Sequence, residues 1–412
     1  MNDRAISTEV AVVGGGLVGP ALALSLAREG FQVALIDRLA EPVRRDPAFD
    51  GRGYAIALVS ARLLETLELW QGLAPLAQPI RDIRVSEGAG GRTTGWGRLH
   101  FDPRETDDGR VGWILEDRWL RRALLDAVAA RAAITPIAPA TVASAAFDGP
   151  RARLTLADGR LVTAVLAVAA DGRRSTLAPM AGIARQVFAY RQSGLVAAIA
   201  HERPHGGLAH QSFFPGGPFA VLPLPDAEDG THRSSLVWSE RAAVAERLMA
   251  LDDAGYEAEL ARRIGPRLGR LRLIAERRAY PLDLTLAETY AVDRCVLVGD
   301  AAHGVHPIAG QGFNLGLRDV AALAAVLGEA ASRGEDYGQR AVLARYERAR
   351  RGDNALFALG MDGLNRLFSN ANPALGAVRA LGLSLVDALP GAKRALMRQA
   401  AGLEAPRPSD GP

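Results

Sequence analysis

The stretch Val13-Gly14-Gly15-Gly16-Leu17-Val18-Gly19 predicts how the chain begins to fold. It follows the apolar run 9–13, which is typical of a buried strand, and it opens residues 18–29, whose apolar side chains recur at helical spacing. Gly14 permits a tight turn, Gly16 lets a pyrophosphate approach the backbone, and Gly19 lets the helix pack closely on the strand. The free N–H groups at the start of the helix then face the phosphates. The sequence therefore predicts a β-α-β unit that binds a dinucleotide.

An acidic residue stands where such a unit needs one. Residues 32–37 form a second strand-like run, and its last residue, Asp37, comes about twenty residues after the glycines, where a carboxylate accepts a ribose hydroxyl. Arg38 follows directly and is assigned to the same site. A glycine turn alone is a weak signal, but strand, helix and acid occur here together. We therefore prefer dinucleotide binding to an ordinary glycine turn.

The composition limits the class of protein. The 412 residues, 49% of them hydrophobic, indicate a well-packed chain of more than one unit. The single cysteine, Cys295, excludes an internal disulfide and a cysteine-based metal site, and we expect no metal. The net charge of +3 comes with many arginines but no nucleic-acid motif, so we expect no nucleic acid. We see neither a signal peptide nor a bilayer-spanning run, and expect a cytoplasmic protein, with peripheral contact at the inner face of the cell membrane left open.

Apolar periodicity and turn residues predict the remaining elements. Residues 80–101 are strand-like, residues 151–170 alternate like a hairpin around Ala157-Asp158-Gly159-Arg160, and residues 188–278 alternate strands with one helix. The predicted helices are 60–69, 119–131, 241–264, 314–329 and 342–368. The fold class is therefore α/β, with a Rossmann-like domain interleaved with a mixed β-sheet substrate domain and followed by a C-terminal helical region.

A second segment carries an acid and a glycine at a strand end. Asp171-Gly172-Arg173-Arg174-Ser175 follows the apolar run 165–168. Asp-Gly after a strand is most often only a turn, and that alternative stays open. A turn at the carboxyl end of a parallel strand can also reach a ligand in the crevice, which makes Asp171 and Gly172 candidates for cofactor binding.

A third segment repeats this pattern after the apolar run 294–298. It reads Gly299-Asp300-Ala301-Ala302-His303 and continues through Pro307 to Gly310-Gln311-Gly312-Phe313-Asn314. Asp300 is placed to accept a hydroxyl of a polyol chain. Gly310 and Gly312 expose backbone amides just before a helix, a site suited to an electron-rich oxygen. Three glycine-bearing strand ends exceed what an NAD site needs, so the predicted cofactor is FAD.

On these residues the chain resembles the group A flavoprotein monooxygenases of the para-hydroxybenzoate hydroxylase type. More closely, it is similar to the ubiquinone-biosynthesis hydroxylases, among them the 2-polyprenyl-6-methoxyphenol hydroxylases. The further motifs are Asp50-Gly51-Arg52, Ser175 after the Asp-Gly pair, and the run His306-Pro307-Ile308-Ala309-Gly310-Gln311-Gly312-Phe313-Asn314-Leu315-Gly316, which is specific to the quinone branch. The similarity extends over residues 9–368, most of the chain.

The resemblance implies FAD as cofactor and NAD(P)H as transient electron donor. The residues implied to bind FAD are Gly14, Gly16, Gly19, Asp37, Arg38, Arg52, Asp171, Gly172, Gly299, Asp300, Gly310, Gly312, Phe313 and Asn314. Among them, Asp300 would bind the ribityl chain, and Gly312 and Asn314 would donate near the isoalloxazine ring. The backbone carbonyl of Pro307 would face the substrate ring, which is the one catalytic assignment. Ala178 stands where many relatives have an arginine.

The implied activity is hydroxylation of the aromatic ring of a polyprenyl phenol in ubiquinone biosynthesis, with dioxygen and a flavin hydroperoxide. The substrate-pocket candidates are Tyr190, Phe213, Phe219 and Val221, and an ordinary strand core is the alternative. A base that takes the phenol proton would help the reaction. Tyr190, His210 and His303 are candidates, with none preferred.

The resemblance also implies how the chain is divided. The predicted FAD-binding domain comprises residues 1–75, 105–182 and 281–330, the substrate domain comprises 76–104 and 183–280, and C-terminal helices at 331–405 precede a disordered tail at 406–412. Residues 372–403 have an apolar face with basic residues between, which fits packing on the protein or lying on a membrane surface.

Two other functions stay open. One is hydroxylation of a small soluble phenolic compound, which the quinone-type run Gly310-Gln311-Gly312 disfavours. The other is a non-catalytic, FAD-stabilised subunit of a quinone-biosynthesis complex, which the intact segment 300–314 disfavours. Other quinone-biosynthesis proteins are therefore considered as partners besides the substrate and dioxygen.

Overall fold

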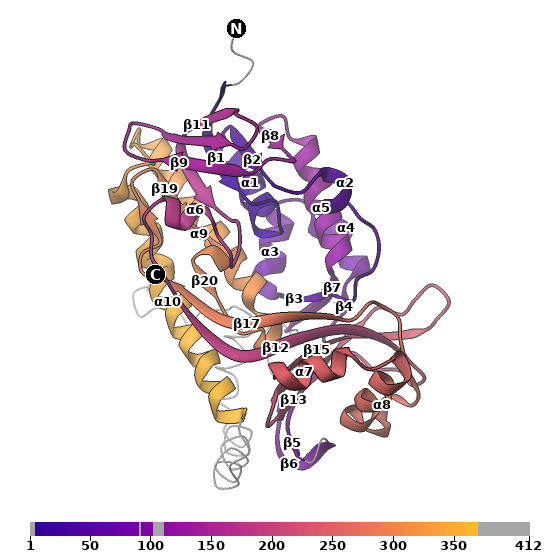
Figure 1. Ribbon diagram of the computed structural model, residues 1–412. Coiled ribbons are helices and arrows are strands. Elements are labelled where there is room, and N and C mark those ends of the chain that lie inside the picture. Colours follow the sequence, from indigo (N-terminus) through magenta and orange to yellow (C-terminus); the bar gives the residue numbers. More distant parts are fainter. Residues whose placement is uncertain (1–4, 90–91, 102–110, 370–412) are drawn as a thin grey trace, which may run out of the picture.

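The computed structural model describes residues 5–89, 92–101 and 111–369, which form two large sheets with helices packed around them (Figure 1). The first sheet has eight strands among these residues, in the order β18-β19-β11-β1-β2-β8, and β10 and β9 extend it from β11. The strands are β1 (Ala5–Val13), β2 (Val33–Ile36), β8 (Ile134–Ile137), β9 (Val142–Ala146), β10 (Ala152–Leu156), β11 (Leu161–Ala169), β18 (Ala291–Val292) and β19 (Cys295–Leu297).

The central strands of this sheet are parallel and buried. β1 pairs in parallel with both β11 and β2, and every residue of β2 is buried. Parallel strands are covered on both faces, which is why they carry continuous runs of valine, alanine, leucine and isoleucine. The carboxyl ends of β1, β11 and β19 therefore meet at one edge, where all three glycine-bearing segments begin.

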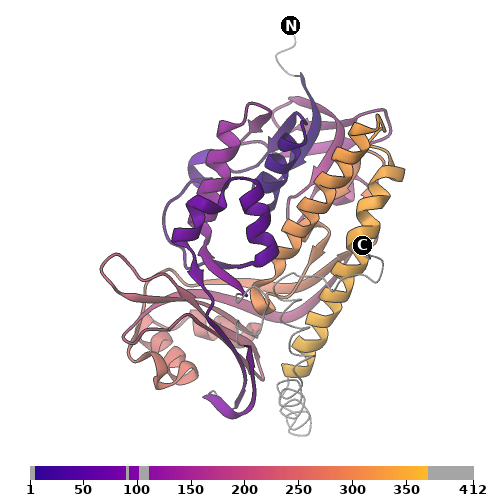
Figure 2. The same cartoon turned by 180° about the vertical axis from the view of Figure 1, so that it is seen from behind.

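Helices cover the faces of the first sheet. α1 packs against α5 and α9, and Figure 2 shows α9 and α10 lying side by side. The helices and 3₁₀ turns of this part are α1 (Val18–Arg28), α2 (Glu41–Arg44), α3 (Leu58–Thr66), α4 (Trp70–Leu73), η1 (Ala74–Leu76), α5 (Asp117–Ala130), α6 (Leu177–Met180), η4 (Gly299–Ala301), η5 (Ile308–Gly310), α9 (Gly312–Ser332) and α10 (Arg340–Phe368). No helix among the described residues is long and apolar enough to cross a membrane.

The second sheet runs below the first, and its long strands β12 and β17 cross the molecule in Figure 1. Within the described residues its order is β20-β17-β12-β15-β14-β13-β5-β6, with β16 paired to β12. Its strands are β5 (Asp82–Ala89), β6 (Arg92–Phe101), β12 (Arg185–His201), β13 (Leu208–Phe214), β14 (Gly217–Leu224), β15 (His232–Arg241), β16 (Leu271–Leu273), β17 (Arg278–Ala287) and β20 (His303–Gly304).

Two helices cover one face of the second sheet and leave the other face toward the first. α7 (Ala242–Met249), α8 (Asp253–Ile264) and the turn η3 (Pro266–Leu268) enclose a separate core that contains Trp238 and Tyr256. A small sheet of β3 (Gly53–Ala57), β7 (Gly112–Glu116) and β4 (Gln78–Pro79) lies between the two large ones (Figure 1).

The predicted interleaved α/β architecture is confirmed. β5 and β6 belong to the second sheet, but a long segment of the first unit separates them in sequence from the other strands of that sheet. The hairpin of β10 and β11 is also confirmed. The single helix predicted at 241–264 is wrong: the chain breaks after α7, and the Asp252 carboxylate accepts the Gly255 N–H at 2.8 Å to start α8 as an N-cap. The domain boundaries stay a prediction, and the predictions for 372–403 and 406–412 lie outside the described residues.

Candidate active site

The glycine turn after β1 joins two elements at very short range. A Cβ atom on Gly14, whose φ is +117°, would lie 2.2 Å from the Ala170 carbonyl oxygen at the end of β11. A Cβ atom on Gly19 would lie 1.8 Å from the Gly14 carbonyl oxygen. At Gly16, by contrast, no atom lies within 4 Å of the Cβ position. Two glycines therefore close the strand–helix junction, and the third leaves the space at the start of α1 that a pyrophosphate needs.

Asp37 lies directly beside this turn. Its Oδ2 atom accepts the Gly15 N–H at 2.5 Å, and its Oδ1 atom accepts the Leu39 N–H at 2.8 Å. Arg44 of α2 is buried beside Asp37, and its Nε atom lies 3.9 Å from Asp37 Oδ1. This Nε atom has no hydrogen-bond partner among the described residues. Sequence reasoning missed Arg44, because nothing local shows that α2 folds back onto the glycine turn. Arg38 is exposed.

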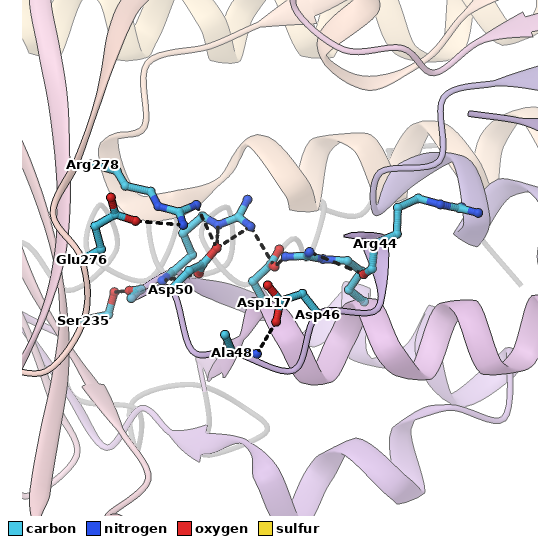
Figure 3. A network of polar contacts seen from close by, with 11 residues as sticks. Arg44, Asp46, Ala48, Asp50, Asp117, Ser235, Glu276 and Arg278 are labelled. Carbon is cyan, nitrogen blue, oxygen red and sulfur yellow. Dashed lines mark hydrogen bonds and ion pairs between the residues drawn. The ribbon is translucent and has the colours of Figure 1, made fainter. Parts of the chain in front are cut away.

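Arg52 belongs to a charged network between the two sheets, of which Figure 3 labels Asp50, Asp117 and Arg278. Its guanidinium lies 2.6 Å from Asp50 and 3.0 Å from Asp117 at the start of α5. Burial opposes ionisation of Asp50, but the hydrogen bond from Arg52 prevails and lowers the pKa of that carboxyl. Arg278 of β17 approaches Asp50 at 3.5 Å. The network ties the loop before β3 to the substrate sheet, and the contact of Arg52 with the flavin stays a prediction.

The second segment folds against the first. Asp171 follows β11 and Ala170, and its Oδ2 atom accepts the N–H groups of Thr176 at 2.7 Å and Leu177 at 3.2 Å. The carboxylate thus caps the N–H groups at the start of α6. This structural role agrees with the alternative that the Asp-Gly pair forms an ordinary turn. Its Oδ1 atom is buried and has no hydrogen-bond partner in the part of the chain that the structure describes. The N–H of Ala178 donates to the Ser175 hydroxyl at 3.2 Å, within the same turn.

The third segment follows β19 and also lies next to the start of α1. The side chain of Val18, at the start of α1, lies 3.5 Å from the Cβ position of Gly299. Asp300 pairs with Arg173 of the second segment at 3.2 Å and keeps 35% of its side chain exposed. The Cβ position of Gly312 is 3.9 Å from Asp300 Oδ1, at the start of α9. The structure therefore brings all three segments together around the N-terminus of α1.

A fully buried carboxylate supports this third turn from behind. Asp319 of α9 accepts the Gly299 N–H at 2.9 Å and lies 2.5 Å from Nε2 of His303, and its other oxygen accepts Nε of Arg350 at 2.9 Å. Asn354 of α10 donates to it at 3.0 Å. Burial opposes ionisation, but His303 and Arg350 hold the pKa of Asp319 at about 2. His303 therefore holds the loop in place. Sequence reasoning missed Asp319, since its partners lie on other elements.

Asn314 is also held by backbone groups. Its Oδ1 atom accepts the Ala57 N–H at 3.0 Å and the Ser60 hydroxyl at 2.7 Å, and its Nδ2 donates to the Ala55 carbonyl at 2.9 Å. The Phe313 ring lies 5.5 Å from that of Tyr54, between ring centres. The side chain of Asn314 thus fixes β3 and α3 against α9. Its contact with the isoalloxazine ring stays a prediction.

The expected pocket wall is divided between the two faces of the second sheet. Phe213 packs with Ile308 and Phe368 on the face toward the first sheet. Phe219 and Val221 lie on the other face, in the core under α7 and α8. Their assignment to the same wall as Phe213 is wrong, because Phe219 pairs with Ser212, one residue away from Phe213, and neighbouring strand residues point to opposite faces.

The remaining candidates lie in two places. His210, on the core face of β13, is 3.0 Å from the Ser86 hydroxyl and not on the face of Phe213. Tyr190 contacts the ring of His306, which precedes Pro307. The Pro307 carbonyl accepts the Gly310 N–H at 3.1 Å and keeps a second lone pair for another partner.

This arrangement defines a dinucleotide-binding flavoprotein, with open space at Gly16 beside the start of α1 and a partly exposed carboxylate at Asp300. An FAD binding domain family matches residues 7–355. The chain is 44% identical over 394 residues to ubiquinone hydroxylase UbiL of Rhodospirillum rubrum, covering 96% of this chain and 89% of that protein. It is 37% identical over 401 residues to the 3-demethoxyubiquinol 3-hydroxylase of Escherichia coli strain K12, covering 96% and 99%.

A solved structure shares the fold. The p-nitrophenol 4-monooxygenase PnpA of Pseudomonas putida DLL-E4 superposes with a TM-score of 0.80 at 19% identity, over 98% of this chain and 100% of that chain. The chain belongs to the family of FAD-dependent aromatic monooxygenases that includes the ubiquinone-biosynthesis hydroxylases. When bound, FAD supplies the redox chemistry that activates dioxygen, and the protein supplies binding, orientation and shielding from water.

Proposed function

We propose that this protein hydroxylates the aromatic ring of a polyprenyl phenol during ubiquinone biosynthesis, with dioxygen and with NAD(P)H as electron donor. The observation that carries the proposal is the identity of 44% with a ubiquinone hydroxylase over 96% of the chain. It is supported by the apolar cluster of Phe213, Ile308 and Phe368 next to Pro307, which suits a ring that lacks charge.

Different residues hold different parts of the cofactor in this proposal. Gly14, Gly16, Gly19 and Asp37 hold the ADP half, and Asp300 binds the ribityl chain. Backbone amides at Gly312, Phe313 and Asn314 face the isoalloxazine ring, and Arg38, Arg52, Gly299 and Gly310 complete the site. Asp171 and Gly172 contribute through the backbone of their turn, because the Asp171 carboxylate is engaged by the turn itself.

We also propose a cytoplasmic protein that touches the inner face of the cell membrane, from which it takes its substrate. Four exposed leucines, Leu356, Leu359, Leu364 and Leu367, lie within one face of α10. Such a face can dip into the headgroup region. Flotation with anionic phospholipid vesicles measures this contact, and we expect Leu356→Ser/Leu359→Ser to weaken it. Binding that needs another quinone-biosynthesis protein instead would favour a protein partner.

Deletion of the gene tests the function directly. We expect a quinone precursor that lacks one ring hydroxyl to accumulate, and its mass and fragmentation to identify the ring carbon that this protein hydroxylates. Normal quinone levels, in a cell without a second homologue, would reject the proposal. NAD(P)H oxidation by the purified protein that only a small soluble phenol stimulates would favour the alternative substrate.

A further inference from the structure

Two side chains beside Pro307, the buried His306 and the partly buried Tyr190, have no task in the site described so far. The rings of Tyr190 and His306 meet edge to face, with 5.2 Å between their centres. His306 is 1% exposed, and neither of its ring nitrogens has a hydrogen-bond partner among the described residues. The hydroxyl of Tyr190 is buried and has none of normal geometry within the described residues either, although the Asp362 carboxylate is near enough to interact with it. A buried polar atom without a partner costs about 1–3 kcal/mol, so three of them at one point indicate a ligand site.

The backbone is distorted where Tyr190 is placed. β12 pairs regularly with β17 except for a register shift between Ala189 and Gln192. Within this bulge Arg191 has a φ of +55°, a conformation that costs a residue with a Cβ atom on the order of 1 kcal/mol. Bulges re-aim side chains and are frequent next to active sites. This one accompanies the contact of Tyr190 with His306, at the junction of the substrate sheet, the Pro307 loop and α10.

The charges around the pair decide which ligand it can take. Burial, and to a smaller extent Arg173, lower the pKa of His306 to about 3, although Asp362 opposes them. The imidazole is therefore neutral at physiological pH, with one donor and one acceptor nitrogen. Burial and Asp362 raise the pKa of Tyr190, so that its hydroxyl stays protonated. The pair thus offers donors and an acceptor without net charge, which matches a hydroxyl group better than a carboxylate or a cation.

Besides these charged groups, apolar side chains pack around Tyr190. Tyr190 packs against the cluster of Leu284, Val305, Leu315, Phe357 and Ala358. Met361 of α10 belongs to the rim of this cluster and also of the one formed by Phe213, Ile308 and Phe368. The polar pair therefore borders the apolar wall next to Pro307, and the two together have the chemistry of an aromatic ring with one hydroxyl.

We propose that Tyr190 and His306 bind the ring hydroxyl of the aromatic substrate, an inference that rests on the proposed function. His306 accepts the hydrogen bond from the hydroxyl, and Tyr190 donates to the same oxygen. Accepting that hydrogen increases electron release into the ring, and the two bonds together fix the ring's rotation relative to Pro307. The pair selects a free phenol over a ring whose oxygen carries no hydrogen.

A comparison of two ligands and two variants tests this assignment. The probes are 2-prenylphenol and its O-methyl ether, and their Kd values are measured on the FAD-loaded protein from the change in flavin absorbance. We expect the wild type to prefer the phenol by about 10-fold or more, as one or two hydrogen bonds allow. His306→Phe should reduce that preference to about 3-fold or less by weakening phenol binding, because it removes the acceptor for the hydroxyl hydrogen. Tyr190→Phe should weaken the binding of both probes by a similar factor, because either oxygen can accept the hydrogen bond from Tyr190.

Met361→Leu is the matched control, because it changes the same apolar rim and removes no hydrogen-bonding group. It should keep the preference for the phenol. FAD content and Tm of each variant report folding, and each of the two ring variants tests its own hydrogen bond if the other is unstable. A preference that survives in His306→Phe, undiminished binding of both probes to Tyr190→Phe, or a wild type without any preference overturns the assignment. A wild type that prefers the phenol but hydroxylates neither probe nor any polyprenyl phenol contradicts the proposed function instead, and leaves the pair's role standing.

Discussion

Asp171 and Asp300 occupy equivalent places in the sequence pattern but do different work. Each follows a strand of the same parallel pair, β11 and β19, and each stands in a turn with a glycine beside it. The Asp171 carboxylate accepts two N–H groups of its own turn and caps α6. The Asp300 carboxylate reaches Arg173 of the other turn and remains 35% exposed. An acidic side chain that follows a strand can therefore either stabilise its own turn through hydrogen bonds or remain available to a group outside that turn.

The difference lies in what supports each turn. The turn of Asp300 is held from behind by Asp319, which accepts the Gly299 N–H and pairs with His303 and Arg350. The Asp300 carboxylate therefore does not have to stabilise its own turn, as the Asp171 carboxylate does. Four experiments test this contrast between Asp171 and Asp300, and the one with the largest expected effect comes first.

Asp319→Ala should destabilise the protein most. It leaves His303 buried without its carboxylate and Arg350 with Asp353 as its remaining carboxylate partner, and removing one member of a buried ion pair costs about 3–5 kcal/mol. Urea unfolding of the FAD-loaded protein measures the loss. The control is Asp148→Ala, which removes an exposed ion pair with Arg153 and should cost less than about 1 kcal/mol. Equal losses in the two variants would contradict the supporting role of Asp319.

Asp300→Ala should weaken FAD binding while the fold stays intact. Hydrogen bonds to a charged group contribute about 1.5–3 kcal/mol, so we expect the Kd for FAD to rise about 10- to 100-fold. Fluorescence titration of the apoprotein measures it. Asp283→Ala removes the other carboxylate on Arg173 and should change the Kd much less. A change of less than about 3-fold in Asp300→Ala would refute the assignment to the ribityl chain.

Acid should release the support of the Asp300 turn. The folded pKa of Asp319 is about 2, below the ordinary value of 3.8, so its contribution is complete above pH 4 and is lost as pH falls toward 2. The loss should amount to about 2 kcal/mol. Thermal unfolding between pH 5 and pH 2.5 measures it against Asp319→Asn, which cannot titrate. A stability gap between the two proteins that stays constant with pH would argue against this.

Asp171→Ala should have the smallest effect, and on stability alone. Losing the cap of α6 costs about 0.5–2 kcal/mol, and we expect the Kd for FAD to change less than about 3-fold. Asp171→Asn keeps an oxygen for the cap and should recover most of the stability. If Asp171→Asn instead weakens FAD binding as much as Asp300→Ala does, the two carboxylates share the same task and the contrast between them fails.

Sequence reasoning succeeded where neighbours along the chain carry the information. The glycines at 14, 16 and 19, the acid at 37 and the alternation of β10 and β11 are local patterns, and each describes its own turn, helix or strand. The break between α7 and α8 was local as well, since Asp252 stands three residues before Gly255, the spacing of an N-cap, but the apolar periodicity on both sides concealed it.

The strand–glycine–helix units, the order of the three glycine-bearing segments and the family could all be predicted from the amino-acid sequence. The face of the second sheet that each side chain joins became known from the folded chain, which places Phe213 beside Ile308 and Phe219 and Val221 in a separate core. The tertiary structure alone brought Asp319 to His303 and Arg350, and Tyr190 to His306. The reason is physical: strand alternation shows that two faces exist but not which one is inside, and a buried polar group finds its partner through space.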